Sequence, residues 1–285
     1  MEENYLSDFD RADVDLVVEN ELNRIARYTR HSNPSAVLLA GQPGAGKTVL
    51  SSMLSKAKHD DVFFINADEY RRFHPHYQEL YELYGSDSVQ MTSAFSGAVT
   101  ETLIHALSDE RLHLIIEGTG RTTEVPHRTA ELLTGKGYRV ELAVIAARPE
   151  LSLCSTLLRF YEMNEGGTIP RATAAAAHDH IVGVLPDNLD ILRGDAAIAK
   201  LTIWDRTPDI LYASDSSTEK PSEVLRSYWY RPWSDEEYDR TVEIISLLRQ
   251  KEEQYHLGQT AAIDELAQRV QNVAHELSVD QTMSL

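Results

Sequence analysis

The chain has 285 residues, a net charge of −18 and a single cysteine, Cys154, which exclude an internal disulfide and a cysteine-based zinc site. So acidic a chain lacks the basic face that nucleic acid requires, and we expect no nucleic-acid partner. The sequence shows no signal-peptide pattern and no apolar run long enough to cross a bilayer, so we expect a cytoplasmic protein with no membrane partner.

Residues 1–34 predict a polar, acidic leader with one amphipathic helix, because apolar residues recur at helical spacing between Val14 and Ala26. A turn cluster, Ser32-Asn33-Pro34-Ser35, ends this leader. The apolar run 36–40 that follows predicts a strand.

The motif after this strand is the strongest signal in the chain, and it reads Gly41-Gln42-Pro43-Gly44-Ala45-Gly46-Lys47-Thr48. A strand, then G-x-x-x-x-G-K-T, then a helix is the context of a phosphate-binding loop. The glycines let backbone N–H groups surround a triphosphate, and the helix N-terminus adds its positive dipole end. Lys47 is placed to reach the β- and γ-phosphates, and the Thr48 hydroxyl to ligate Mg²⁺.

The rest of the region 35–214 alternates strands with helices. The predicted strands are 36–40, 62–66, 112–117 and 140–146, with a weaker pair at 201–204 and 210–212, and the predicted helices are about 47–58, 88–108, 125–136, 149–162 and 173–192. This alternation predicts a three-layer α/β fold with a mostly parallel central sheet. Residues 215–285 are polar, with helical periodicity at 236–248 and 261–277, and predict a helical C-terminal appendage.

The residues elsewhere in the chain indicate which class of P-loop protein this is. A guanine-specific N-K-x-D segment is absent, which weighs against a GTPase, and no strand ends in the paired Asp-Glu of a mechanochemical ATPase. Small-molecule kinases place an acidic residue after the second strand and supply arginines from a mobile lid. Both features are present, so the sequence predicts a P-loop kinase-like fold.

Polar residues after the strands give the candidate site, since ligands of parallel sheets bind beyond the carboxyl ends of the strands. Asp68 follows the second strand and is placed to accept the proton of an acceptor hydroxyl, although an Asp here could simply cap the next helix. Glu69 is its exposed rival. Glu117, Thr119 and Arg121 follow the third strand and suit a sugar attached to a diphosphate. Arg148 follows the fourth.

Arg159 and Arg171 flank the glycine-containing segment 163–170. They are placed either to neutralise a phosphoryl-transfer transition state or to form surface ion pairs, and spacing alone does not decide between these roles. Two histidine pairs, His74-Pro75-His76 and His178-Asp179-His180, have metal-ligand spacing. However, a Mg²⁺–phosphate enzyme uses oxygen ligands, so we expect packing or surface roles for these histidines.

Five segments occur in an order that resembles the zeta toxins, the kinase half of epsilon/zeta-type bacterial toxin–antitoxin pairs. They are Gly41–Thr48, Asn66–Tyr70, Phe73–Tyr77, Ile116–Thr122 and Pro170–Thr173. The resemblance extends from about residue 35 to residue 212. Asn66 departs from it, since family members often carry Asp there, and residues beyond about 250 have no counterpart that can be placed.

The resemblance implies ATP- and Mg²⁺-dependent phosphorylation of the 3′-hydroxyl of the amino sugar of UDP-N-acetylglucosamine. The product would block cell-wall precursor synthesis, and a small helical antitoxin would cover the nucleotide site. By the same resemblance Lys47 and Thr48 serve ATP and Mg²⁺, Asp68 is the general base, and Arg159 and Arg171 grip the transferred phosphate. The residues that match nucleotide-sugar positions are Glu101, Glu117, Thr119, Arg121 and Thr129.

Two alternatives stay open. One is a kinase of the same architecture for another nucleotide sugar or for an antibiotic hydroxyl. The other is a nucleotide-dependent switch whose leader and C-terminal helices bind a partner protein. Periodicity by itself makes Glu101 a solvated helix residue.

Overall fold

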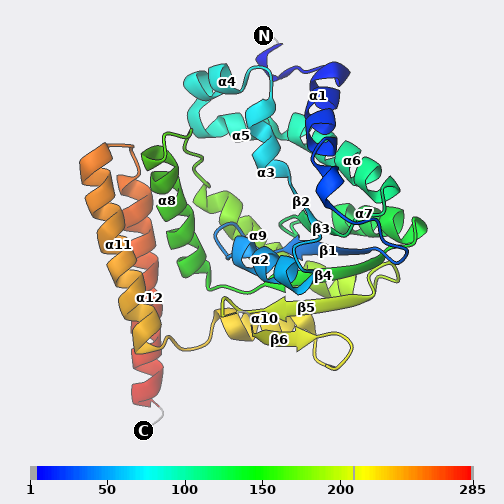
Figure 1. The fold of residues 1–285 in the computed structure, drawn as a ribbon. Helices are drawn as coiled ribbons and strands as arrows, with labels where there is room; N and C mark the ends of the chain where they lie inside the picture. Colours follow the sequence, from blue (N-terminus) through cyan, green and yellow to red (C-terminus); the bar gives the residue numbers. More distant parts are fainter. Residues whose placement is uncertain (1–4, 208, 284–285) are drawn as a thin grey trace.

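The computed structural model describes residues 5–207 and 209–283, which fold around a six-stranded sheet (Figure 1). The strands are β1 (Ser35–Ala40), β2 (Phe63–Asn66), β3 (Leu114–Glu117), β4 (Arg139–Ile145), β5 (Lys200–Trp204) and β6 (Ile210–Ala213). Their order across the sheet is β2-β3-β1-β4-β5-β6, with parallel pairing throughout except for β6, which runs antiparallel to β5. The predicted, mostly parallel sheet is confirmed.

Helices cover both faces of the sheet. They are α1 (Arg11–Leu22), α2 (Lys47–Ala57), α3 (Ala67–Tyr70), α4 (Tyr77–Tyr84), α5 (Ser88–Met91), α6 (Ser93–Asp109), α7 (Glu124–Gly135), α8 (Pro149–Glu165), α9 (Ala175–Arg193), α10 (Pro221–Trp229), α11 (Asp235–Tyr255) and α12 (Thr260–Met283). One face of the sheet packs against α1, α6, α7, α9 and α10, and α2 packs on the opposite face. The strands are apolar on both sides because both faces are buried.

One predicted helix is divided in the structure. The sequence pattern predicts a continuous helix over 88–108, whereas α5 ends at Met91 and α6 begins at Ser93. The Thr92 hydroxyl donates to the main-chain oxygen of Ser88 (2.9 Å), and Arg71 donates to the main-chain oxygen of Val89 (2.6 Å) at this junction. The apolar period continues through the break, so the pattern alone does not reveal it. Helices α3, α4 and α10 were also not predicted.

The C-terminal region divides between two cores. Leu225 and Trp229 of α10 belong to the main core, while α11 and α12 form a helical pair that packs on α8 around a second core (Figure 1). Arg148 joins the two parts, because its buried guanidinium donates to the main-chain oxygens of Trp229 (3.0 Å) and Pro232 (2.8 Å). The helical appendage is confirmed, and Arg148 has a structural role. The domain boundary near residue 214 stays a prediction.

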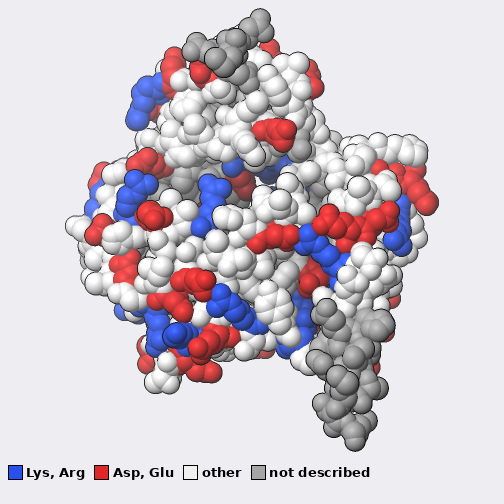
Figure 2. Space-filling view, turned by 180° about the vertical axis from the view of Figure 1, so that it is seen from behind, with Lys and Arg blue, Asp and Glu red and all other residues white. Residues whose placement is uncertain are grey.

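Acidic and basic side chains are interspersed over the face of the molecule drawn in Figure 2. Among the described residues, no helix combines the length and the apolar character that a membrane span requires.

Candidate active site

The loop between β1 and α2 is shaped by three glycines in backbone conformations that other residues rarely adopt. The φ angles of Gly41, Gly44 and Gly46 are +145°, +74° and +108°. A Cβ atom on Gly44 would lie 2.0 Å from the main-chain oxygen of Ser152 on α8. The loop therefore folds tightly against α8, and only glycine fits at position 44.

We expect Gly44→Ala to destabilise the loop and to weaken nucleotide binding by about tenfold or more, because a left-handed backbone costs a non-glycine residue about 1–3 kcal/mol and the added Cβ would also displace main-chain atoms of α8. Gly183→Ala on α9 is the matched control, since a Cβ there meets no atom within 4 Å. This control should stabilise the protein slightly. Thermal unfolding and titration with a fluorescent ATP analogue would measure both effects. Unchanged analogue affinity in Gly44→Ala would contradict the loop assignment.

Lys47 points back into its own loop. Its Nζ donates to the main-chain oxygens of Gly41 (2.9 Å) and Gln42 (3.3 Å) and lies 3.8 Å from Glu117 Oε1. Burial lowers the pKa of Lys47, although the charges of Glu117 and Asp68 act to raise it. Burial likewise raises the pKa of Glu117 despite the attraction of Lys47. Burial thus disfavours the charged forms of both Lys47 and Glu117. The negative oxygens of a bound phosphate would stabilise the Lys47 ammonium.

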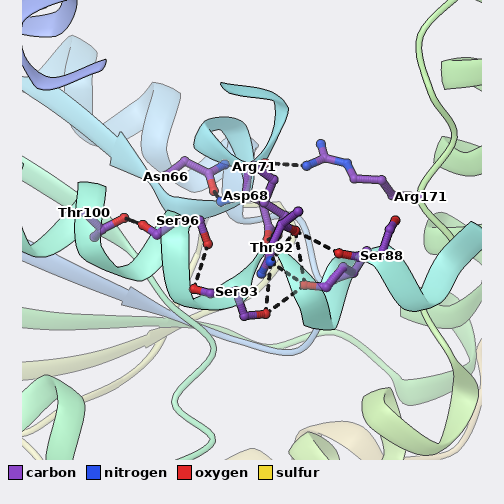
Figure 3. Close-up of polar contacts among 10 residues, drawn as sticks. Asn66, Asp68, Arg71, Ser88, Thr92, Ser93, Ser96, Thr100 and Arg171 are labelled. Atoms are coloured by element: carbon purple, nitrogen blue, oxygen red, sulfur yellow. Dashed lines mark hydrogen bonds and ion pairs between the residues drawn. The ribbon is translucent and has the colours of Figure 1, made fainter. Parts of the chain in front are cut away.

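Asp68 lies in the first turn of α3, directly after β2. The cap of this helix is Asn66, whose Oδ1 accepts from the Asp68 main-chain N–H (3.0 Å), so the capping alternative for Asp68 is wrong (Figure 3). Partial desolvation acts to raise the pKa of Asp68, whose side chain is 56% exposed, but Arg71, Arg171 and Lys47 together outweigh it and hold this pKa below its usual value. The carboxyl is therefore ionised near neutral pH, as a proton acceptor must be.

Arg71 orients this carboxylate. Its Nε lies 2.8 Å from Asp68 Oδ1, and its Nη1 donates to the main-chain oxygen of Val89 and the Ser93 hydroxyl (3.1 Å) at the α5–α6 junction (Figure 3). The sequence analysis missed Arg71. Its position three residues after Asp68 in a short helical segment was the available signal, because residues at that spacing share a helix face.

The two arginines that flank the segment 163–170 both affect the charged groups of the site, which are Lys47, Asp68 and Glu117. Arg159, exposed on α8, lowers the pKa of both Lys47 and Glu117 through its charge. Arg171 lies beyond the end of α8, and its Nη1 donates to the main-chain oxygen of Asp68 (Figure 3). The structure thus brings Arg171, at the far end of the segment 163–170, to the backbone that follows β2.

The segment after β3 adjoins the phosphate-binding loop. Gly41 N–H donates to the main-chain oxygen of Thr119 (3.3 Å), and the Thr119 hydroxyl accepts from the Arg121 N–H (3.4 Å). Among the described residues, no hydrogen bond or ion pair joins Arg121, Thr129 of α7 or the exposed Glu101 of α6 to the Lys47–Asp68–Glu117 group. The substrate roles of these three residues stay predictions, as do those of Glu117 and Thr119.

Arg206 was also missed. It follows β5, and its Nη2 donates to the main-chain oxygen of Gly44 (2.9 Å) and to the Ser155 hydroxyl of α8 (2.8 Å). Burial lowers the pKa of this guanidinium. The rule that ligands gather at the carboxyl ends of parallel strands applies to β5 as well. The strand pattern at 201–204 is weak, so the sequence gives little indication of this position.

Comparison with known proteins identifies relatives along most of the chain. The zeta toxin family model matches residues 19–217. The chain is 38% identical over 238 residues to toxin PezT of Streptococcus pneumoniae (81% of this chain, 92% of that protein) and 37% identical over 215 residues to toxin zeta of Streptococcus pyogenes (75% of each).

Comparison with solved structures gives the same result as comparison with known sequences. A chain from the PezAT chromosomal toxin–antitoxin system of Streptococcus pneumoniae matches with a TM-score of 0.74 and 34% identity, covering 87% of this chain and 98% of that one. The AvrRxo1-ORF1:ORF2 complex with ATP matches with a TM-score of 0.54 at 13% identity (86% of this chain, 85% of that one), which shows a similar fold. On the family match and the identities to its curated members, the chain belongs to the zeta toxin family.

Proposed function

We propose that this protein is an ATP-dependent kinase that phosphorylates the 3′-hydroxyl of the amino sugar of UDP-N-acetylglucosamine, and that it is the toxin of a toxin–antitoxin pair. One observation carries the proposal. The carboxylate of Asp68 is kept ionised in part by the charges of Lys47 and Arg171, and Arg171, from the end of the segment 163–170, donates to the main-chain oxygen of the same residue. A kinase needs these three groups at one place.

Each group has a role in this reaction. Lys47 and the loop N–H groups hold the phosphates, and Asp68 accepts the proton of the acceptor hydroxyl as its oxygen attacks the γ-phosphorus. Arg159 and Arg171 stabilise the negative charge spread over the transferred group. The exposed Thr48 hydroxyl, in the first turn of α2, is the hard oxygen ligand that fits Mg²⁺. When bound, this ion would offset charge on the phosphates.

The relatives support the toxin assignment. Those that match are named as toxins, and one matching structure comes from a toxin–antitoxin system. We infer that a small helical antitoxin covers the nucleotide site and that the kinase acts in the cytoplasm, where ATP is available.

A panel of acceptors would test the substrate. With γ-labelled ATP we expect label transfer to UDP-N-acetylglucosamine to exceed transfer to UDP-glucose and to an aminoglycoside by about tenfold or more, because sugar-reading contacts discriminate by at least 1–3 kcal/mol. Preferred transfer to another acceptor would overturn the substrate and leave the kinase. Transfer to no acceptor, together with nucleotide-dependent binding of a partner protein, would favour the switch alternative.

A further inference from the structure

A continuous set of polar contacts links the C-terminal helix α12 to the phosphate-binding loop. Arg269 of α12 makes a two-pronged contact with Asp179 of α9 (Nη1–Oδ1 3.0 Å, Nη2–Oδ2 2.8 Å). Asp179 Oδ1 lies 3.1 Å from Nδ1 of His178, whose Nε2 lies 2.7 Å from the Ser152 hydroxyl of α8. The Ser152 hydroxyl in turn lies 3.3 Å from Nε2 of Gln42, the second residue of the loop.

The protons in this set can be assigned from the groups that can only accept or only donate. Burial lowers the pKa of His178 despite the opposing effect of Asp179, so the imidazole is neutral near neutral pH. Its single proton belongs on Nδ1, since the Asp179 carboxylate can only accept. Nε2 is then an acceptor 2.7 Å from the Ser152 hydroxyl, whose single proton is shared between Nε2 and the main-chain oxygen of Pro149, 2.8 Å away. The Ser152 oxygen accepts from Gln42 Nε2, which also donates to the main-chain oxygen of Ala147 (2.7 Å).

The three inner members of the set have no access to solvent. Gln42, Ser152 and His178 are each 0% exposed, so the Ser–His–Asp sequence of contacts cannot present a nucleophile to a substrate. Ser152 touches the loop a second time, because its main-chain oxygen occupies the space where a Gly44 side chain would be. The polar set therefore acts on the position of the loop.

We propose that Arg269 is a positioning residue for the phosphate-binding loop, and that through it the helical pair α11–α12 contributes to nucleotide affinity. The Arg269 guanidinium holds the Asp179 carboxylate, which fixes the His178 tautomer, and this tautomer orients the Ser152 hydroxyl against Gln42. The proposal rests on the nucleotide site proposed above but not on the identity of the acceptor. It gives α12 a role in nucleotide binding that the sequence did not indicate.

The test uses the full chain and a fluorescent ATP analogue, so it requires no acceptor. Arg269→Gln should weaken analogue binding by about fivefold, the size expected for coupling carried through a contact network. Arg269→Lys keeps the charge but loses the two-pronged geometry, and it should recover part of the affinity. The matched control is Arg249→Gln, which removes an exposed α11–α12 ion pair with Asp264 (3.1 Å) that does not touch the polar set. The control should bind like the wild type.

A double-mutant cycle separates positioning from simple attachment of the helix. If the contacts act in series, Ser152→Ala combined with Arg269→Gln should bind no more weakly than the weaker single variant. The ¹⁵N spectrum of His178 should show one Nδ1–H tautomer in the wild type and loss of that preference in Arg269→Gln. Arg269→Gln affinity equal to that of the control, or losses that multiply in the double variant, would overturn the proposal. Failure of the wild type to bind the analogue would instead overturn the proposed nucleotide site. Analogue binding without phosphoryl transfer to UDP-N-acetylglucosamine would overturn only the proposed acceptor.

Discussion

Asp68→Asn is expected to reduce kcat for phosphoryl transfer to UDP-N-acetylglucosamine by about 10²–10⁴-fold, the usual contribution of a general base. The amide keeps an oxygen that can accept from Arg71, which now lies 2.8 Å from the carboxylate, so the local geometry should persist. The amide cannot take up the acceptor proton. ATP affinity should be almost unchanged, because Lys47 and the glycine loop are intact. Steady-state transfer assays and analogue titration would measure the two effects separately.

Glu69→Gln is the matched control for this prediction. Glu69 is the adjacent exposed carboxylate of α3, and its replacement changes the charge of the site by the same amount. Turnover in this control should stay close to that of the wild type. If Asp68→Asn turns over normally while Glu69→Gln does not, the base has been assigned to the wrong residue.

Lys47→Ala is expected to abolish growth arrest when the protein is produced in bacteria and to lower transfer in vitro by about 10²–10³-fold, as removal of a transition-state cation does. The loss of Lys47 leaves Glu117, whose side chain is 15% exposed, without its partner. The pKa of Glu117 is already raised by burial, so this carboxyl should take up a proton rather than unfold the chain.

Lys56→Ala controls for the loss of a positive charge from the same helix. Lys56 is exposed in the last turn of α2, and its removal should leave growth arrest intact. Growth curves at matched protein levels, with thermal unfolding of both variants, would separate loss of activity from loss of fold. Full toxicity of Lys47→Ala would contradict the role of the loop in phosphate binding.

The architecture could be predicted because strands buried on both faces have a recognisable amino-acid composition. Strands buried on both faces must be largely apolar, and β1–β4 are, with polar residues only at their ends and at Glu141, so their positions could be read from the chain. The phosphate-binding loop was equally clear, since the Gly44 position tolerates no side chain and the lysine follows at a set distance. Local constraints of this kind are visible in a single sequence.

The contacts that complete the site were not visible, because they join residues distant in the chain. Arg206 reaches Gly44 across 162 positions, and Arg269 reaches Asp179 across 90. No spacing rule links such residues. His178 was expected to have a packing or surface role, and its burial agrees with packing, but its neighbours could be known only from the fold.

A crystal structure with Mg²⁺, a non-hydrolysable ATP analogue and UDP-N-acetylglucosamine would test the central claim most directly. We predict that an Asp68 carboxylate oxygen lies within hydrogen-bonding distance of the 3′-hydroxyl, and that this hydroxyl faces the γ-phosphorus in line with the bond to be broken. A complex in which Asp68 stays paired with Arg71, with the sugar on the far side of the sheet edge from the γ-phosphate, would contradict it.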